Sequence, residues 1–138
     1  MMTEAEAAAR RSKIILGVDD QPDNIMILES LIETQGFTFF GVNSGAEGLS
    51  LAQRVNPRLI LMDIQMPGMD GFETCRRLRR IPSLATVPVA FLTACKSVDD
   101  VKSGIAAGGN DFILKPIDPE KLLARVAHWT TRRVNAAA

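Results

Sequence analysis

The chain alternates between short apolar runs and longer segments with helical spacing of apolar residues. Five runs are typical of strands buried in a sheet: Ile14–Val18, Phe37–Val42, Arg58–Met62, Val87–Leu92 and Asp111–Leu114. After each run, apolar residues recur every three or four positions, which places them on one face of a helix. The pattern therefore predicts five consecutive strand-helix units.

Each predicted helix has a residue near its start whose side chain can cap the first turn: Asp23 or Asn24, Ser44, Asp70, Ser97 and Asp118. Glycine or Asn-Pro follows three of the helices, at Gly36, Asn56-Pro57 and Gly108-Gly109. The helix from Gly71 to about Arg80 carries four arginines, interpreted as a solvated face: Arg76, Arg77, Arg79 and Arg80. The helix after Ser97 has its apolar stripe at Val98, Val101 and Ile105.

Strict alternation of strands and helices predicts an α/β protein with a parallel sheet, right-handed crossovers and helices on both faces. We expect a flavodoxin-like (βα)5 three-layer sandwich with strand order 2-1-3-4-5. Ligands of that fold bind where strands 1 and 3 end. In this chain those strands end at Asp19-Asp20 and at Asp63.

Composition narrows the class of protein. A chain of 138 residues fits one domain, and Lys+Arg and Asp+Glu balance at 16 each, which argues against general nucleic-acid or membrane binding. Cys75 and Cys95 have no metal-ligand spacing and fit a reducing compartment. We find no signal-peptide core or membrane-spanning run, and we expect a cytoplasmic protein. Residues 1–12 are expected to be a flexible extension and 131–138 a tail.

The strand ends of this topology bring together Asp19, Asp20, Asp63, Thr93 and Lys115. Three neighbouring carboxylates repel one another unless they share a proton or hold a cation. Carboxylate oxygens favour Mg²⁺ or Mn²⁺, and Mg²⁺ often bridges a carboxylate to a phosphate. A carboxylate can itself accept a phosphoryl group, while an ammonium and a hydroxyl neutralise the phosphoryl oxygens. The set is therefore typical of phosphoryl transfer.

Four motifs, in this order, resemble those of the response-regulator receiver domain, the phosphorylated half of a two-component phosphorelay. They are Val18-Asp19-Asp20, the run D-I-Q-M-P-G-M-D-G from Asp63 to Gly71, Leu92-Thr93-Ala94 and Lys115-Pro116. The successive intervals from Asp20 to Asp63, from Asp63 to Thr93 and from Thr93 to Lys115 are 43, 30 and 22 residues, also similar to the family's. The resemblance spans about residues 13 to 128, and we assign the domain to residues 13–130.

The resemblance implies that Asp63 is the phosphoacceptor. Asp19, Asp20 and Asp63 would ligate Mg²⁺, or Mn²⁺, together with the backbone carbonyl of Gln65. Thr93, Ala94 and Lys115 would contact the phosphoryl group, and the Lys115-Pro116 bond would be cis. Phe112 would occupy the switch-aromatic position, so that phosphorylation changes the surface formed by helix 4, strand 5 and helix 5.

The family further implies a bacterial signalling protein whose phosphodonor is a histidine kinase or a histidine phosphotransfer protein. Its chemistry is limited to Mg²⁺-dependent self-phosphorylation and autodephosphorylation, so we do not class it as an enzyme. No nucleic-acid or membrane partner is expected. Asp111 and Arg125 resemble members of a dimer face, but Lys121 replaces an expected acid. We therefore expect the protein to be a monomer or a weak dimer.

Three positions depart from the family's frequent residues. Phe112 lacks a tyrosine hydroxyl, Gln21 stands where an acid is common, and Cys95 is a poor partner for attacking water, which predicts a long-lived phosphoryl group. The chain could be a stand-alone regulator, a relay shuttle or a module excised from a hybrid kinase or longer regulator. A haloacid-dehalogenase-like phosphatase is the enzyme alternative, but Gln65 stands where it needs a second acid.

Overall fold

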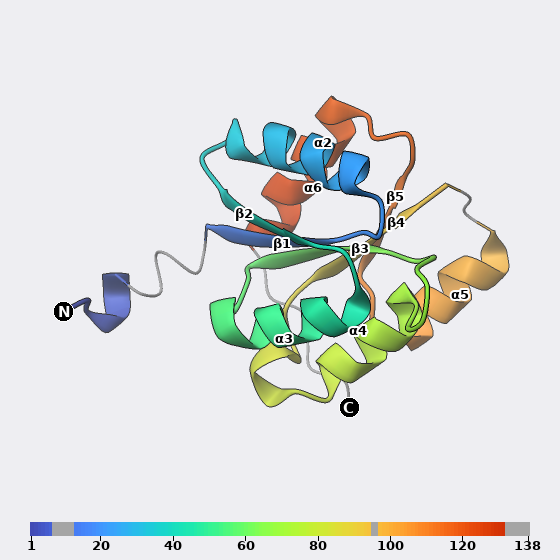
Figure 1. Ribbon diagram of the computed structural model, residues 1–138, viewed down its shortest axis with the longest axis horizontal. Coiled ribbons are helices and arrows are strands. Elements are labelled where there is room, and N and C mark those ends of the chain that lie inside the picture. Colours follow the sequence, from blue (N-terminus) through green and yellow to red (C-terminus); the bar gives the residue numbers. More distant parts are fainter. Residues whose placement is uncertain (7–12, 95–96, 132–138) are drawn as a thin grey trace.

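The computed structural model describes residues 1–6, 13–94 and 97–131. Five strands form one parallel sheet in the order β2-β1-β3-β4-β5 (Figure 1): β1 (Ile14–Val18), β2 (Thr38–Val42), β3 (Leu59–Asp63), β4 (Val89–Thr93) and β5 (Asp111–Leu114). The helices are α2 (Pro22–Glu33), α3 (Gly45–Val55), α4 (Gly71–Arg79), the 3-10 helix η1 (Pro82–Leu84), α5 (Val98–Ala106) and α6 (Pro119–Thr130). The predicted fold class and strand order are confirmed.

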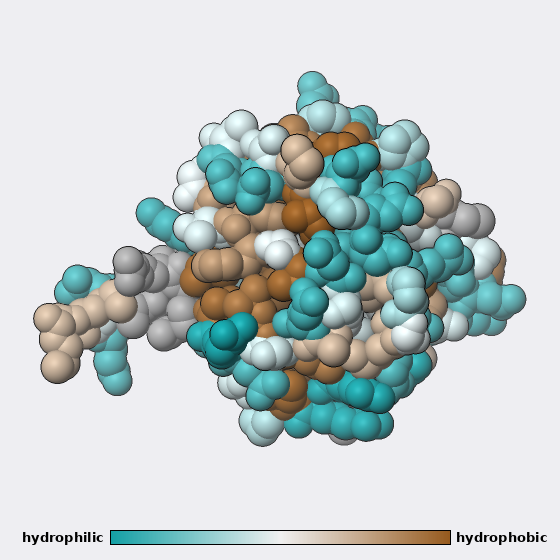
Figure 2. All heavy atoms as spheres, in the orientation of Figure 1, coloured by the Kyte–Doolittle hydropathy of each residue, from teal (hydrophilic) through white to brown (hydrophobic). Residues whose placement is uncertain are grey.

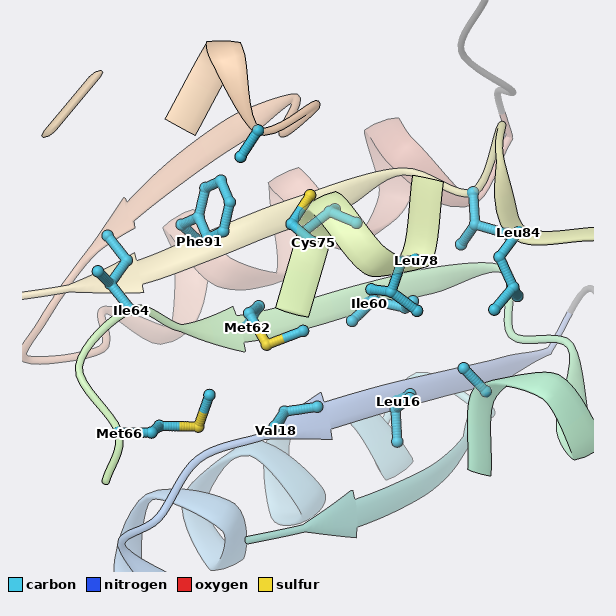
Figure 3. Packing of buried hydrophobic residues seen from close by; sticks show 14 residues of the cluster. Leu16, Val18, Ile60, Met62, Ile64, Met66, Cys75, Leu78, Leu84 and Phe91 are labelled. Carbon is cyan, nitrogen blue, oxygen red and sulfur yellow. The ribbon is translucent and has the colours of Figure 1, made fainter. Parts of the chain in front are cut away.

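Two hydrophobic clusters, one on each face of the sheet, make the molecule a three-layer sandwich. One cluster packs Leu16, Ile60 and Phe91 of the sheet against Cys75 and Leu78 of α4 (Figure 3). The other packs alternate strand residues against α2 and α6, which cover the opposite face (Figure 1): Ile15, Leu59, Leu61, Leu92, Leu28, Ile32, Leu122 and Val126. Alternate residues of a strand point to opposite faces of the sheet, so each strand contributes side chains to both clusters.

The central strand β3 is buried along its whole length, from Leu59 to Asp63. β1 and β4 flank it in parallel register, with Val18 beside Met62 and Asp63 beside Leu92. Strands buried on both faces are continuously apolar, which explains the pattern of the β3 run. β2 lies at the edge, where Phe40 is 37% exposed and apolar side chains reach the surface between α2 and α3 (Figure 2).

Four of the predicted helix caps are confirmed: the side chains of Ser44, Asp70, Ser97 and Asp118 accept hydrogen bonds from first-turn N–H groups. The predicted cap of α2 at Asp23 or Asn24 is wrong. That helix begins at Pro22 after Gln21, whose side chain makes no capping bond. Proline is tolerated in a first turn because it has no N–H group that needs a partner there.

Some boundaries and one helix face differ from the prediction. β2 starts at Thr38 and β4 runs from Val89 to Thr93, each shifted by one or two residues. Arg79 is not part of a solvated face: its guanidinium is turned inward and bonds to segments distant along the chain. Helical spacing alone did not separate it from Arg76 and Arg77, which pair with Glu73 at the surface.

The apolar stripe predicted for α5 is largely exposed, since Val98 is 71% and Ile105 64% accessible to solvent. Gly104 is the buried residue of this helix. α5 therefore contributes little side-chain surface to the core, and its glycine brings it close to β4 and β5 instead.

At the termini, residues 4–6 form a helical turn, whereas 7–12 of the expected extension and 132–138 of the expected tail lie outside the described residues. No helix in the described part of the chain is both long and apolar enough to cross a membrane.

Asp111, at the start of β5, ties the edge of the sheet to α6. Its carboxylate accepts hydrogen bonds from the Phe112 N–H and the Trp129 Nε1–H, both at 2.8 Å, and pairs with Arg125. Asp111 and Arg125, which resemble residues of a dimer face, are thus bonded to each other within the chain. Burial acts to raise the pKa of Asp111, but the bonds from Arg125 and Trp129 outweigh it, and the pKa is lowered.

We expect Asp111→Ala to lower the free energy of unfolding by roughly 1–3 kcal/mol at pH 7. The substitution removes a hydrogen-bonded carboxylate and leaves the donors of Phe112, Arg125 and Trp129 without their acceptor. The folded pKa of Asp111 lies below the unfolded value, so its contribution is present above about pH 4 and is lost as pH falls through the folded pKa. Urea denaturation of both proteins at pH 7 and pH 3 measures this. Glu29→Ala, at an exposed position of α2, is the control and should change little.

Candidate functional site

The carboxyl ends of β1 and β3 place three carboxylates side by side. Asp19 and Asp20 directly follow β1, and Asp63 is the last residue of β3. One oxygen from each lies within 4.8 Å of the others. Asp19 is fully buried and Asp63 is 6% exposed. The structure thus brings together the three acids that the sequence analysis singled out.

Lys115 reaches this cluster from the other side of β4. It follows β5, and its backbone N–H donates to the Thr93 carbonyl at 2.8 Å, which extends the sheet by one residue. Its ammonium donates to Asp19 Oδ2 at 3.1 Å and to Asp63 Oδ1 at 3.2 Å. The second Asp19 oxygen accepts the Gln21 N–H at 2.9 Å. The next peptide bond, between Lys115 and Pro116, is cis.

Burial and the neighbouring charges change the acid-base properties of the cluster. Burial, aided by the charges of Asp19 and Asp20, raises the pKa of Asp63 to about 6, and the charge and hydrogen bond of Lys115 offset only part of the rise. For Lys115, burial acts to lower the pKa, but the bonds and charges of Asp19 and Asp63 outweigh it and raise the pKa. The ammonium is therefore charged at neutral pH, and Asp63 is mostly ionised but electrostatically strained.

A divalent cation fits this donor set. Three carboxylate oxygens converge within 4.8 Å at the mouth of a cleft of about 400 Å³. Hard oxygen ligands in an open site suit Mg²⁺, which retains water molecules. The positive charge of a cation would also offset the burial and the neighbouring carboxylate charges that together raise the pKa of Asp63.

The cleft collects the remaining candidates except Phe112. Thr93, Ala94, Gln65 and Lys115 line it together with Asp20 and Asp63. Thr93 is buried, whereas Ala94 and Gln65 are exposed at the rim. Cys95, on which the expected phosphoryl lifetime depended, lies outside the described residues.

Phe112 lies behind the cleft, between β4 and α5. Its ring centroid is 5.5 Å from that of Phe91, and a Cβ atom added to Gly104 would come within 2.4 Å of its Cζ. The sequence interpretation put Phe112 at the end of its strand, next to Thr93, but Phe112 is the second residue of β5 and pairs with Phe91, whereas Leu114 is the residue beside Thr93.

Two cleft residues were missed by the sequence reasoning. Asn24 was interpreted as a cap, and Asp100 was given no function, yet both line the cleft. A positional signal was available, because each lies in the first turn of the helix that follows a site-bearing strand. First-turn side chains after parallel strands face the crevice at the carboxyl edge.

The loop after Asp63 is shaped by glycines. Gly68 has a φ of +76°, a left-handed conformation that disfavours other residues. At Gly71, a Cβ atom would lie 2.2 Å from the Asp63 carbonyl oxygen, and the Gly71 N–H donates to the Ile64 carbonyl at 2.8 Å. The first residue of α4 therefore rests directly on the backbone of the central acid.

Residues 15–127 match the sequence profile of the response regulator receiver domain. Because the match covers most of the chain, the protein belongs to the receiver domain family of two-component response regulators. Members of this family are phosphoacceptors.

Among curated relatives, response regulator PleD of Caulobacter vibrioides is 39% identical over 116 residues, covering 84% of this chain and 26% of PleD. The chain thus spans about a quarter of the length of that relative. The structure of the chemotaxis protein CheY4 of Vibrio cholerae aligns with a TM-score of 0.82 at 28% identity, covering 84% of this chain and 97% of CheY4.

The receiver domain of the sensor histidine kinase PA1611 from Pseudomonas aeruginosa aligns with a TM-score of 0.81 at 29% identity, covering 87% of this chain and 98% of that domain. Its structure contains a magnesium ion coordinated in the active-site cleft. The structural relatives therefore share the fold of this chain.

We expect Asp63→Asn to stabilise the metal-free protein above about pH 6, by roughly 1–3 kcal/mol, because it removes a charge that the site disfavours. The folded pKa of Asp63 is higher than the unfolded value near 4, so the folded state binds the proton more tightly between these pH values. The contribution of Asp63 to the free energy of unfolding of the wild type therefore falls as pH rises from about 4 to 6. The stability difference in favour of Asp63→Asn appears over the same pH range.

Urea denaturation in a chelator at several pH values tests this prediction. Glu29→Gln, at an exposed position, should leave the pH profile unchanged. A variant no more stable than wild type at pH 8 would contradict the electrostatic strain at Asp63.

Proposed function

We propose that residues 13–130 act as the phosphoacceptor domain of a two-component phosphorelay, and that Asp63 receives the phosphoryl group. The convergence of Asp19, Asp20 and Asp63 with the Lys115 ammonium at one sheet edge is the observation that carries the proposal. The donor is a histidine kinase or a histidine phosphotransfer protein. Self-phosphorylation and autodephosphorylation are the chemistry of the domain, without turnover of a separate substrate.

In the transfer, an Asp63 carboxylate oxygen attacks phosphorus, the P–N bond to the donor imidazole breaks, and the imidazole nitrogen keeps the electron pair and takes up a proton. The pKa of about 6 leaves Asp63 largely ionised at pH 7, as a nucleophile must be. Lys115, already within 3.2 Å of Asp63, pairs with the phosphoryl oxygens, and Thr93 and the Ala94 N–H donate to them.

Asp19, Asp20, Asp63 and the Gln65 backbone carbonyl hold Mg²⁺, or Mn²⁺, in this proposal. Once bound, the cation supplies neutralisation of charge on the carboxylate and phosphoryl oxygens. The oxygens of Asp19 and Asp20 that the cation requires lie beside Asp63. Asp63 can therefore accept a negatively charged phosphoryl group only when a cation compensates the negative charge of the three carboxylates.

Acetyl phosphate with Mg²⁺ should add one phosphoryl group to the wild-type chain, and none to Asp63→Asn, because the amide is not a nucleophile. Intact-mass spectrometry measures this. Asp70→Asn is a matched control, since Asp70 lies in the same loop but caps α4. Labelling of Asp63→Asn equal to wild type would refute the assignment, and omission of Mg²⁺ should reduce labelling of the wild type at least about tenfold.

The signal leaves the site through Thr93 and Phe112. When Thr93 moves toward a phosphoryl oxygen, Phe112 gains room to rotate and the surface of α5, β5 and α6 changes. A population swing from 1:99 to 99:1 requires about 5.5 kcal/mol of differential binding. One charge-assisted hydrogen bond supplies roughly 1.5–3 kcal/mol, so Thr93 acts together with Lys115 and the cation.

Thr93→Ala should therefore weaken the conformational response without abolishing binding of beryllofluoride, a phosphoryl mimic. In amide NMR spectra with beryllofluoride and Mg²⁺, residues 63–65 should still shift, while shifts around Phe112 should fall by about half or more. Thr38→Ala, at an exposed position of β2, serves as the control. An unchanged response around Phe112 in Thr93→Ala would mean that the signal takes another route.

A further inference from the structure

Arg79, the last residue of α4, has a partly buried guanidinium whose N–H groups are all hydrogen-bonded. Its Nε–H donates to the Gly108 carbonyl at 2.9 Å, and Nη2 donates to the same carbonyl at 2.7 Å and to Asn110 Oδ1 at 2.9 Å. Nη1 donates to the carbonyls of Leu84 at 3.1 Å and Val87 at 2.6 Å. An arginine has five side-chain N–H donors, and all five are used. We call this set the Arg79 network.

The network contains a cation but no anion. In the described part of the chain, no carboxylate forms an ion pair with Arg79, and burial lowers the pKa of its guanidinium. A buried charge is costly unless hydrogen bonds replace its hydration. Uncharged carbonyl oxygens do so here, and one of them, from Gly108, follows the negative end of the α5 dipole. The geometry of these acceptors therefore has to be kept for the charge to stay buried.

The network joins the segments that flank α5 and β4. Gly108, with a φ of +99°, lies two residues after α5, and a Cβ atom there would lie 2.7 Å from Arg79 Cγ. Asn110 precedes β5, and its Oδ1 also accepts the Val89 N–H at 2.9 Å. The start of β4, the start of β5 and the end of α5 are thus held at one point by Arg79.

The opposite end of the same helix touches the phosphoacceptor. Gly71 rests on the Asp63 carbonyl, and Phe72 stacks edge-on against Phe91 with centroids 5.1 Å apart. Phe91 in turn contacts Phe112. The nine residues of α4 therefore connect the backbone of Asp63 at one end to the base of α5 and β5 at the other (Figure 1).

We infer that Arg79 is a positioning residue that fixes the Gly108 end of α5 relative to Asp63, so that displacement at the Thr93 end turns α5 about Gly108 and repositions Phe112. This inference rests on the proposed function. The sparse burial of α5 supports it, since Gly104 is its buried residue and Val98 and Ile105 are exposed. A helix held mainly at one end rotates about that end, whereas one released at both ends would move without a defined direction.

The test compares Arg79→Met and Arg79→Lys with wild type and with Arg76→Met, a control on the same helix at an exposed position. Amide NMR spectra are recorded during titration with beryllofluoride and Mg²⁺. In Arg79→Met, the mimic should bind within about threefold of wild type, because Arg79 contacts none of the cleft residues. The ratio of the shift changes of residues 109–112 to those of residues 63–65 should fall to less than about half of its wild-type value.

Arg79→Lys should recover part of the response, because it keeps a cation but has three donors instead of five. A role in stability alone would lower the urea midpoint and leave the ratio of the two sets of shifts unchanged, which would overturn the inference. If Arg79→Met does not fold, the same titration is made with Arg79→Lys. A ratio of the two sets of shifts equal to that of the wild type then overturns the inference. A wild-type chain that does not bind the mimic would instead refute the proposed function, and the coupling with it.

Discussion

Repulsion among three carboxylates at the ends of two buried strands is the constraint on which this structure depends. Asp19 and Asp63 are held in place by β1 and β3, which are anchored in the sheet and cannot separate without breaking their hydrogen bonds. Burial, together with the charges of Asp19 and Asp20, holds the pKa of Asp63 near 6, although the charge and hydrogen bond of Lys115 offset part of the rise. The folded protein therefore keeps an electrostatic strain at the site, which a divalent cation can relieve.

The rest of the fold tolerates this strain because the hydrophobic burial is distributed over both faces of the sheet. Two independent clusters enclose the strands, so that even a short β3 is buried throughout. Polar chemistry is confined to the carboxyl edge, where the chain leaves the sheet and side chains can reach solvent. This separation of a rigid apolar base from a charged rim explains how a strained site persists in a small domain.

The helices are attached to this base very unequally. α4 contacts the central acid through Gly71 and reaches the α5–β5 junction through Arg79, whereas α5 has little buried side-chain surface of its own. Of these two helices, α4 is thus firmly connected to Asp63 and α5 is packed more loosely on the sheet. Of the residues of α5, Gly104 is buried, while Val98 and Ile105 expose apolar side chains on its surface.

The sequence alone predicted the strand order, four helix caps and the meeting of Asp19, Asp20, Asp63, Thr93 and Lys115. These features follow from local patterns: short continuous apolar runs, cap residues at fixed offsets, and polar residues at strand ends. Proximity then followed from topology, because parallel strands deliver their ends to one edge. The order of motifs added the likeness to receiver domains, which the family match bears out.

Tertiary structure decided the features that depend on partners far away along the chain. Arg79 has the same helical surroundings as Arg76, but its bonds to the carbonyls of Leu84, Val87 and Gly108 turn it inward and leave it half-buried, whereas Arg76 is exposed. The exposure of Val98 and Ile105 likewise depends on how few neighbours α5 has, which an apolar stripe does not reveal. The pKa of Asp63 depends on burial and on charges from two other loops, those that follow β1 and β5. Such properties are sums over spatial neighbours, and the local sequence does not contain them.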